Sequence, residues 1–508
     1  MKEHLVILPV LAPLFAGAVL LLCERFGLAA QRALSALAMG LLLALSWALV
    51  AQVSGGDIQI YLLGDWPARL GIALMADRLS ALMVLTSTLL AIACLLYACA
   101  GWDRRAPHFH ALFQFQLVGL NGAFLTGDAF NLFVFFEVLL IASYGLMLSG
   151  GRGVRMRVGL HYVAFNIAAS TLFLIALGLL YGLLGTLNMA EMALRVAAAP
   201  PQDLKLIQAA AGLMLVVFCA KAALLPLYFW LPEAYSRAPA AIAALFAVMT
   251  KVGLYAVLRV GTLMFGASAG ALAGFANSAL LYLGVAALLL AGLGVLAAAR
   301  LRVLVAYLVL VSAATLFIAF ALAQPETIGA GLYYLVHSTF IAAALFLIAD
   351  LIRRRRGDAR DWLQIIAPMP AKTLPALMFL TAAVSVAGLP PLSGFLGKLM
   401  LMQAVPQAQT AWVWTAILLS SFMVIAGLAR AGSRVFWRID ESADAPAAPI
   451  RRPETLAVAL LLGYGIAMTV AAGPIAGYTR AAAEQLLDAE AAIGQMRATA
   501  PLHRSPSP

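Results

Sequence analysis

The chain has 508 residues, of which 64% are hydrophobic and 11% are charged, and its mean hydropathy is +0.98. This composition excludes a soluble globular enzyme, because apolar runs of about 18 or more residues are typical of membrane-spanning helices. A net charge of +11 would suit a nucleic-acid-binding protein. The basic residues follow alternate loops instead, so we expect a lipid bilayer and no nucleic acid around the chain.

Taken in chain order, about fourteen apolar segments predict an all-α polytopic membrane protein. Their centres lie near residues 14, 43, 89, 117, 139, 171, 217, 250, 284, 311, 340, 386, 423 and 466. The first segment follows Met1-Lys2-Glu3-His4, which lacks the net positive charge of a secretory signal, so we expect it to be a retained helix. The sizeable polar stretches, at 54–78, 351–372, 438–454 and after about 479, are too short for a soluble catalytic domain.

Lysines and arginines are divided unevenly between alternate loops. If the N-terminus lies outside, the inner loops hold 21 of them, Arg152 included. The outer segments then hold nine, among them Lys2, Arg69, Arg259 and Arg504. An excess of basic residues in the inner loops is the positive-inside rule. It predicts an even number of crossings of the cell (inner) membrane, with both termini on the outer side.

A weak internal repeat suggests how the segments are organised. LFLIA occurs at 172–176 and again at 345–349, and Leu225-Pro226 is echoed by Leu389-Pro390. In a chain rich in leucine and alanine, chance matches are the alternative. If the repeat is real, it predicts two inverted five-helix units, which is a transporter architecture. The expected divisions are three N-terminal helices (1–105), a first unit (106–265), a second, inverted unit (266–440), and a last helix with a tail (441–508).

Two of the apolar segments contain prolines that predict broken helices. Proline removes a helix hydrogen bond and clashes with the preceding turn. Pro226 follows Lys221 by five residues, and Pro390 precedes Lys398 by eight. Broken helices are tolerated at membrane depth only where the freed backbone groups face protein or water. We therefore expect each break to place a lysine beside a hydrated cavity.

Three of the six lysines, Lys221, Lys251 and Lys398, lie inside long apolar segments, and none of the 27 arginines is expected to do so. A desolvated ammonium group can release its proton near neutral pH, whereas a guanidinium group stays protonated. Charged groups at membrane depth are candidates for function by default. These lysines are therefore candidate proton carriers, although Lys251 could instead extend its ammonium group to the membrane interface.

Glu137 and His337 are the other candidates for proton transfer. Glu137 lies midway along an apolar segment and is flanked by aromatic residues. Moving it relative to Lys221 would change whether the lysine holds its proton, although a structural ion pair with a neighbouring lysine is the alternative. His337 suits proton transfer near neutral pH, but it could also be a buried histidine with satisfied hydrogen bonds. Glu233, close to Lys221 along the chain, is a secondary candidate.

Other polar residues predict no additional site. Asp128 and Asp350 lie near helix ends, where anchoring a loop is at least as good an explanation as transport. Cys23, Cys94, Cys99 and Cys219 lie in apolar segments without the spacing of a zinc site, so we expect them to pack and to bind no metal. No glycine-rich phosphate-binding motif is present in the sequence, so we expect no nucleotide cofactor.

Four stretches resemble the proton-antiporter superfamily, which includes antiporter-like subunits of respiratory complex I and of membrane hydrogenases and the large subunits of Mrp-type antiporters. They are GDAFNLFVFFEVLLIASYGL (127–146), KAALLPLYFWLPEAYSRAPAAIAALFAVMTKVGLY (221–255), VHSTFIAAALFLIADL (336–351) and SVAGLPPLSGFLGKL (385–399). The resemblance covers essentially the whole chain. Within the superfamily, the chain is most similar to the D subunits of the Mrp-type Na+(K+)/H+ antiporters, and its ending AGPIAGYTRAAAEQLLDAEAAIGQM also resembles them.

The resemblance implies which residues act in transport. The functional glutamate of the superfamily corresponds to Glu137, and its functional lysines correspond to Lys221, Lys251 and Lys398. In complex I relatives the helix that contains His337 often carries a lysine four residues later, where this chain has Ile341. This departure favours the Mrp type. The resemblance further implies a complex of six or seven different subunits and no organic cofactor.

We therefore expect a proton-conducting subunit of a monovalent cation/proton antiporter. Its protons would pass along Glu137, Lys221, Lys251, His337 and Lys398, and Na+ or K+ would cross through a partner subunit. The alternative is a proton-pumping subunit of a complex I or membrane hydrogenase relative, in which electron transfer elsewhere drives the same path. A carrier for an organic solute is disfavoured, because the buried charges form a spaced series rather than one compact site.

Overall fold

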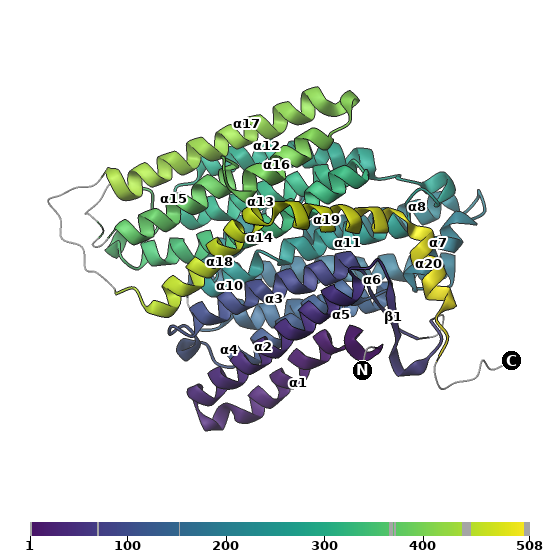
Figure 1. The fold of residues 1–508 in the computed structure, drawn as a ribbon, viewed down its shortest axis with the longest axis horizontal. Coiled ribbons are helices and arrows are strands. Elements are labelled where there is room, and N and C mark those ends of the chain that lie inside the picture. Colours follow the sequence, from purple (N-terminus) through teal and green to yellow (C-terminus); the bar gives the residue numbers. More distant parts are fainter. Residues whose placement is uncertain are drawn as a thin grey trace.

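The computed structural model describes residues 3–68, 71–151, 153–364, 369, 372–438 and 449–501. Long helices run side by side in one bundle (Figure 1). Among the described residues, twelve helices are long and apolar enough to cross a membrane. The predicted all-α polytopic class is confirmed. The predicted charges Lys2, Arg69, Arg152 and Arg504, and the division placed between 440 and 441, lie outside the described residues.

The N-terminal part contains three long helices and a small hairpin. Its elements are η1 (Glu3–Val6), α1 (Leu8–Leu22), η2 (Cys23–Phe26), α2 (Leu28–Val53), β1 (Gln59–Leu62), η3 (Leu63–Asp65), β2 (Ala73–Ala76), α3 (Arg78–Ala98) and η4 (Asp103–Arg105). The strands are antiparallel, with Gln59 opposite Ala76 and Leu62 opposite Ala73. Part of the polar stretch at 54–78 thus folds into a hairpin.

The middle of the chain forms the helices on which the first two candidate lysines lie. Its elements are α4 (Phe109–Leu125), α5 (Ala129–Leu148), α6 (Val154–Leu184), α7 (Met189–Ala197), α8 (Leu204–Lys221), α9 (Trp230–Arg237), α10 (Ala240–Phe246), α11 (Met249–Leu263), η5 (Gly270–Leu272) and α12 (Asn277–Ala297). Between α8 and α9 the helix is interrupted around Pro226, as the sequence predicts.

The remaining helices complete the bundle. They are α13 (Leu301–Ala321), α14 (Pro325–Arg353), η6 (Gly357–Ala359), α15 (Thr373–Ala387), α16 (Ser393–Ala404), α17 (Gln407–Gly432), the π-helix η7 (Ser433–Trp437), α18 (Arg452–Val470), α19 (Ala472–Leu487) and α20 (Ala489–Ala498). The second predicted break separates α15 from α16. The apolar part of α14 is buried along its whole length, as is that of the α10–α11 segment, so these helices form the centre of the fold.

The predicted segments correspond closely to these helices. Twelve of the fourteen predicted centres fall in the twelve candidate spans of the described chain. The other two, near 117 and 386, fall in α4 and α15, which have 17 and 15 residues. The number fourteen and the inverted repeats stay predictions. The polar tail expected after about 479 begins within α19, where Ala482, Ala483 and Leu486 are buried.

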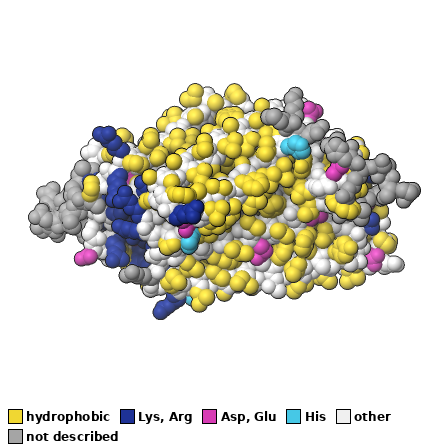
Figure 2. Space-filling model, turned by 90° about the horizontal axis from the view of Figure 1, so that it is seen from below, with side chains coloured by type: hydrophobic (Ala, Val, Ile, Leu, Met, Phe, Trp, Pro, Cys, Tyr) yellow, Lys and Arg dark blue, Asp and Glu magenta, His cyan; other side chains and the backbone are white. Residues whose placement is uncertain are grey.

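Basic side chains are concentrated at one end of the bundle (Figure 2). In Figure 2 lysine and arginine side chains gather at the left, while apolar side chains cover the middle. Helix α1 begins at the opposite end, where α20 also lies (Figure 1). The two ends of the described chain thus lie away from the basic end (Figure 1 and Figure 2). Which side of the membrane each end faces stays a prediction from the positive-inside rule.

Arg259 corrects one expectation from the sequence, because it does lie inside an apolar helix. It is buried in α11 and donates from both terminal nitrogens to Asp77, over 2.5 and 2.8 Å. Asp77 is the residue that caps α3, where its carboxylate accepts from the Ser80 amide. The partner is 182 residues away in the sequence, so the charge of Arg259 is neutralised by a residue that local sequence context cannot reveal.

The Asp77–Arg259 pair generates a stability prediction. Arg259→Met leaves a buried carboxylate unpaired, and removal of one partner of a buried ion pair typically costs about 3–5 kcal/mol. The double variant Asp77→Asn/Arg259→Met removes both charges and keeps a capping side chain, so it should recover much of this loss. Thermal unfolding of the purified protein measures both effects.

The exposed pair of Arg480 and Glu326 is the control. Arg480→Ala should change the free energy of unfolding by at most about 1 kcal/mol, because exposed ion pairs contribute little. Equal losses in Arg259→Met and Arg480→Ala would contradict the assignment of Asp77–Arg259 as a buried link between α3 and α11.

Candidate functional site

The first candidate lysine is joined to Glu137 through a serine. Lys221, the last residue of α8, donates from Nζ to the Ser170 hydroxyl on α6 over 3.2 Å. The same hydroxyl donates to a carboxylate oxygen of Glu137 on α5. Lys221 also lies 5.5 Å from the centre of the Phe136 ring, within the range of a cation–π contact. Three helices therefore meet at one short hydrogen-bonded series.

This arrangement differs from the direct ion pair considered as the alternative role of Glu137. Glu137 and Lys221, both within the described chain, form no direct salt bridge, because the Ser170 hydroxyl lies between them. A hydroxyl can donate one hydrogen bond and accept others, so it can connect the two groups whichever of them holds the proton. Ser170 was not a candidate from the sequence.

The second candidate lysine, Lys251, is fully buried near the start of α11. Its Nζ donates to the Ser312 hydroxyl on α13 over 3.0 Å. Ser312 in turn donates to the Val309 carbonyl of its own helix over 2.8 Å. The partner that the sequence left unidentified is thus a hydroxyl on a neighbouring helix, and Lys251 does not extend to the membrane interface.

His337 and Lys398 lie at the second broken helix. His337 on α14 is 2.8 Å from the Ser393 hydroxyl at the start of α16, measured from Nδ1. Lys398 donates from Nζ to the Ala387 carbonyl and to the Ser421 hydroxyl, each over 3.0 Å. Ser393 and Lys398 both belong to α16, so His337 is hydrogen-bonded to the helix that carries the last lysine.

One chemical regularity unites these four basic groups: each is hydrogen-bonded to the hydroxyl of a serine on another helix. The serines are Ser170, Ser312, Ser393 and Ser421. Burying a charge in a membrane is expensive unless hydrogen bonds satisfy it. A hydroxyl satisfies a buried amine without fixing it in the charged state, as a direct carboxylate partner would. The arrangement can hold a proton at each basic group and can also release it.

Each break has its own way of satisfying the backbone. The Ala220 carbonyl at the end of α8 accepts from the Trp230 indole over 3.1 Å. The Ala387 carbonyl at the end of α15 accepts from Lys398 itself. Protein donors therefore satisfy at least one freed carbonyl at each break. Hydration beside the breaks stays a prediction.

Glu233 is not brought to Lys221. Its side chain is 57% exposed and lies 3.5 Å from Arg237, one turn further along α9. Short distance in sequence is therefore not matched by a contact here, because the side chain of Glu233 is turned to the surface. Asp128 caps α5 through the Asn131 amide, and Asp350 pairs with two arginines, which agrees with the anchoring roles considered for them.

Comparison with known proteins places this geometry in a family. Residues 126–424 match the family described as "NADH:quinone oxidoreductase/Mrp antiporter, TM". The matched range covers more than half of the chain and includes all the candidate residues named above. The chain belongs to this family. Its similarity to Mrp-type antiporters, predicted from sequence motifs, is confirmed by the relatives that follow.

Two relatives are similar over nearly the whole length. The D subunit of the probable K(+)/H(+) antiporter of Rhizobium meliloti (strain 1021) is 40% identical, over 96% of each chain. The D subunit of the Na(+)/H(+) antiporter of Bacillus subtilis (strain 168) is 36% identical, over 96% of this chain and 98% of its own. A chain in the structure of the Mrp complex from Dietzia sp. DQ12-45-1b has a TM-score of 0.87 at 26% identity, covering 98% of this chain and 99% of that one.

Gly394 generates a test of the packing around His337. A Cβ atom at this position would lie 2.8 Å from His337 Nε2 and still closer to the Ser385 carbonyl oxygen. Overpacking of this kind typically costs about 1–3 kcal/mol. We expect Gly394→Ala to lower the thermal stability of the protein and to displace the imidazole ring, which a shift of the His337 NMR signal would report.

Gly463→Ala is the matched control, because a Cβ atom at Gly463 in α18 meets no neighbouring atom within 4 Å. Alanine also has the higher helix propensity, by about 1 kcal/mol. This variant should be as stable as the parent or more so. If Gly394→Ala were equally well tolerated, the close packing of α16 against His337 would be wrong.

Proposed function

We propose that this chain is the proton-conducting subunit of a multisubunit antiporter that exchanges Na+ or K+ for protons. The observation that carries the proposal is the series of buried basic groups, each bonded to a serine hydroxyl. Relatives that are named as D subunits of Na(+)/H(+) and K(+)/H(+) antiporters support it. If the buried charges served only as structural ion pairs, a series of basic groups bonded to hydroxyls would not be needed. Stepwise proton transfer does need such a series.

In this proposal protons move laterally through the centre of the bundle. Glu137 exchanges a proton with Lys221 through Ser170, and Lys251 is the central carrier. His337 receives the proton next, and Lys398 is the last carrier before release. A proton on one basic group disfavours a proton on the next through Coulomb repulsion, so arrival of a new proton promotes release further along.

The partial exposure of Glu137 also supports the assembly of this chain with other subunits. Its side chain is only partly buried, although α5 is one of the candidate membrane spans. A carboxylate exposed to lipid would be costly, so we propose that a partner subunit covers this face and that the coupled cation crosses through a partner. The two ends of the described chain would lie on the outer side of the cell membrane, opposite the basic end.

Proton flux into vesicles that contain the complete complex tests this function. Under an imposed pH gradient, addition of Na+ or K+ should drive proton movement, and removal of the cation should stop it. The alternative within the same family, a redox-driven proton pump, predicts proton movement that follows electron transfer and is independent of these cations.

Ser170 and Lys221 provide the first functional prediction. Ser170→Ala removes the bridge to Glu137, and loss of a hydrogen bond to a charged group, about 1.5–3 kcal/mol, slows the step roughly 10- to 100-fold. Lys221→Arg should abolish antiport, because arginine does not release its proton. Both are measured as cation-dependent proton flux in the assembled complex.

Thr171→Ala is the control, since the adjacent Thr171 hydroxyl is exposed and donates only to the Ile167 carbonyl of its own helix. We expect this variant to transport at the parent rate. Native flux in Lys221→Arg would show that Lys221 is not a proton carrier, and equal flux in the Ser170 and Thr171 variants would remove the bridge from the path.

The Lys398→Gln variant distinguishes the proton-carrying role of Lys398 from its hydrogen bond to the backbone at the second break. The glutamine amide can still donate to the Ala387 carbonyl but cannot carry a proton. We therefore expect the complex to assemble normally and to lose antiport. Lys398→Ala should lose antiport and also some thermal stability, because the carbonyl is left without its donor. Unchanged flux and an unchanged pH profile in Lys398→Gln would contradict the role of Lys398 as the last carrier.

A further inference from the structure

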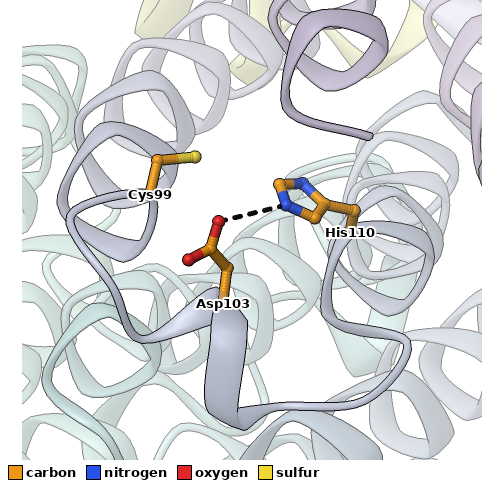
Figure 3. A group of neighbouring side chains, drawn as sticks. All are labelled: Cys99, Asp103 and His110. Carbon is orange, nitrogen blue, oxygen red and sulfur yellow. Dashed lines mark ion pairs between the residues drawn. The ribbon is translucent and has the colours of Figure 1, made fainter. Parts of the chain in front are cut away.

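A second group of reactive side chains lies away from the candidate proton path, at the end of α3. Cys99 caps the end of α3, Asp103 begins η4, and His110 lies in the first turn of α4. The tight connection between these helices turns the three side chains toward one another (Figure 3). One donor atom from each lies within 4.8 Å of the others. The sequence predicted only a packing role for Cys99.

The His110 ring gives an independent indication of a ligand. Its Nδ1 lies 2.8 Å from the Ser35 hydroxyl on α2. Its Nε2 points toward Asp103, 3.4 Å from the carboxylate, yet it is buried and makes no hydrogen bond. A histidine that binds a metal typically uses one ring nitrogen for the metal and the other for a fixed hydrogen bond. Nε2 is thus the ring nitrogen without a hydrogen bond, and apart from its ion-pair contact with the Asp103 carboxylate (dashed in Figure 3) it faces the thiol.

We propose that Cys99, Asp103 and His110 form a binding site for Zn²⁺. Thiolate, imidazole and carboxylate are the ligand types that zinc takes, and three protein ligands with one water form a common zinc site. Bonds of about 2.0–2.3 Å would place tetrahedral ligands roughly 3.3–3.8 Å apart. The separation of 3.4 Å between His110 and Asp103 already falls in this range, and all three donor atoms lie within 4.8 Å of one another, so small side-chain rotations complete the ligand set. Cys99 is only partly buried, which leaves a route for the ion.

Arg32 is the competitor for this site. It donates to both carboxylate oxygens of Asp103, over 2.6 and 2.8 Å. The oxygen that faces His110 is also the one that accepts from the Arg32 Nε atom. Zinc must therefore replace this contact, while the second oxygen can keep the guanidinium group. The Arg32 side chain is 30% exposed and can turn toward water. The thiol proton of Cys99 passes to water on binding, so binding is tighter at higher pH.

Cobalt(II) titration of the purified complex in metal-free buffer tests the site. A bound thiolate gives a sulfur-to-cobalt charge-transfer band in the near ultraviolet, and added Zn²⁺ should remove the band by replacing the cobalt. We expect Cys99→Ser to abolish this band and His110→Asn to weaken cobalt binding by at least about tenfold. Arg32→Met should strengthen binding, because it removes the competing cation.

Matched controls lie close by. Cys94→Ser changes a buried thiol of the same helix, and His108→Asn changes a neighbouring histidine that pairs with Glu24. Neither should alter the band. A band that persists in Cys99→Ser, no charge-transfer band in the parent complex, or weaker binding in Arg32→Met would each overturn the proposal and leave Asp103 as an ion-pair anchor. If His110→Asn fails to assemble, the Cys99→Ser and Arg32→Met variants still decide.

Discussion

The fold depends on one constraint: in a protein interior that excludes water, each polar group must find its partner within the protein. The constraint is met in two different ways. Asp77 and Arg259 satisfy each other fully and join α3 to α11. The basic groups of the candidate proton path are satisfied by neutral hydroxyls. A full ion pair favours one charge state strongly, whereas a hydroxyl partner leaves both states accessible, so the choice of partner distinguishes the anchoring pair from the proposed carriers.

The candidate residues of the proton path could be predicted from the sequence, because a charged residue inside an apolar segment can be recognised from its immediate neighbours. A lysine among leucines stands out wherever it occurs, and prolines beside Lys221 and Lys398 mark the breaks in the helices. The structure places both breaks as expected and shows that Lys251 and His337 are themselves buried, in α11 and α14. The role of each residue in transport stays a prediction, because geometry alone does not measure proton movement.

The partners of these residues were not predictable, because they come from distant parts of the chain. Serine is common in membrane helices, so nothing in the sequence separates Ser170 or Ser312 from other serines. The burial of Arg259, which was counted among the outer charges, was not predicted because its partner Asp77 is far away in sequence. The position of Glu233 could not be predicted for the opposite reason, since closeness to Lys221 along the chain does not make the two side chains neighbours. The grouping of Cys99 with Asp103 and His110 was likewise not predictable, because it depends on the tight turn that brings the three side chains together.

The two broken helices differ in whether the hydrogen bond at the break depends on the charge of the neighbouring lysine. The indole that donates to the Ala220 carbonyl does not titrate, so the strength of this hydrogen bond at the joint between α8 and α9 does not depend on a proton of its donor. At the joint between α15 and α16 the donor is the ammonium group of Lys398. Loss of its proton would weaken that bond, since charge-assisted hydrogen bonds are roughly twice as strong as neutral ones. In the proposed path the second joint would therefore loosen when Lys398 loses its proton, whereas the first would not.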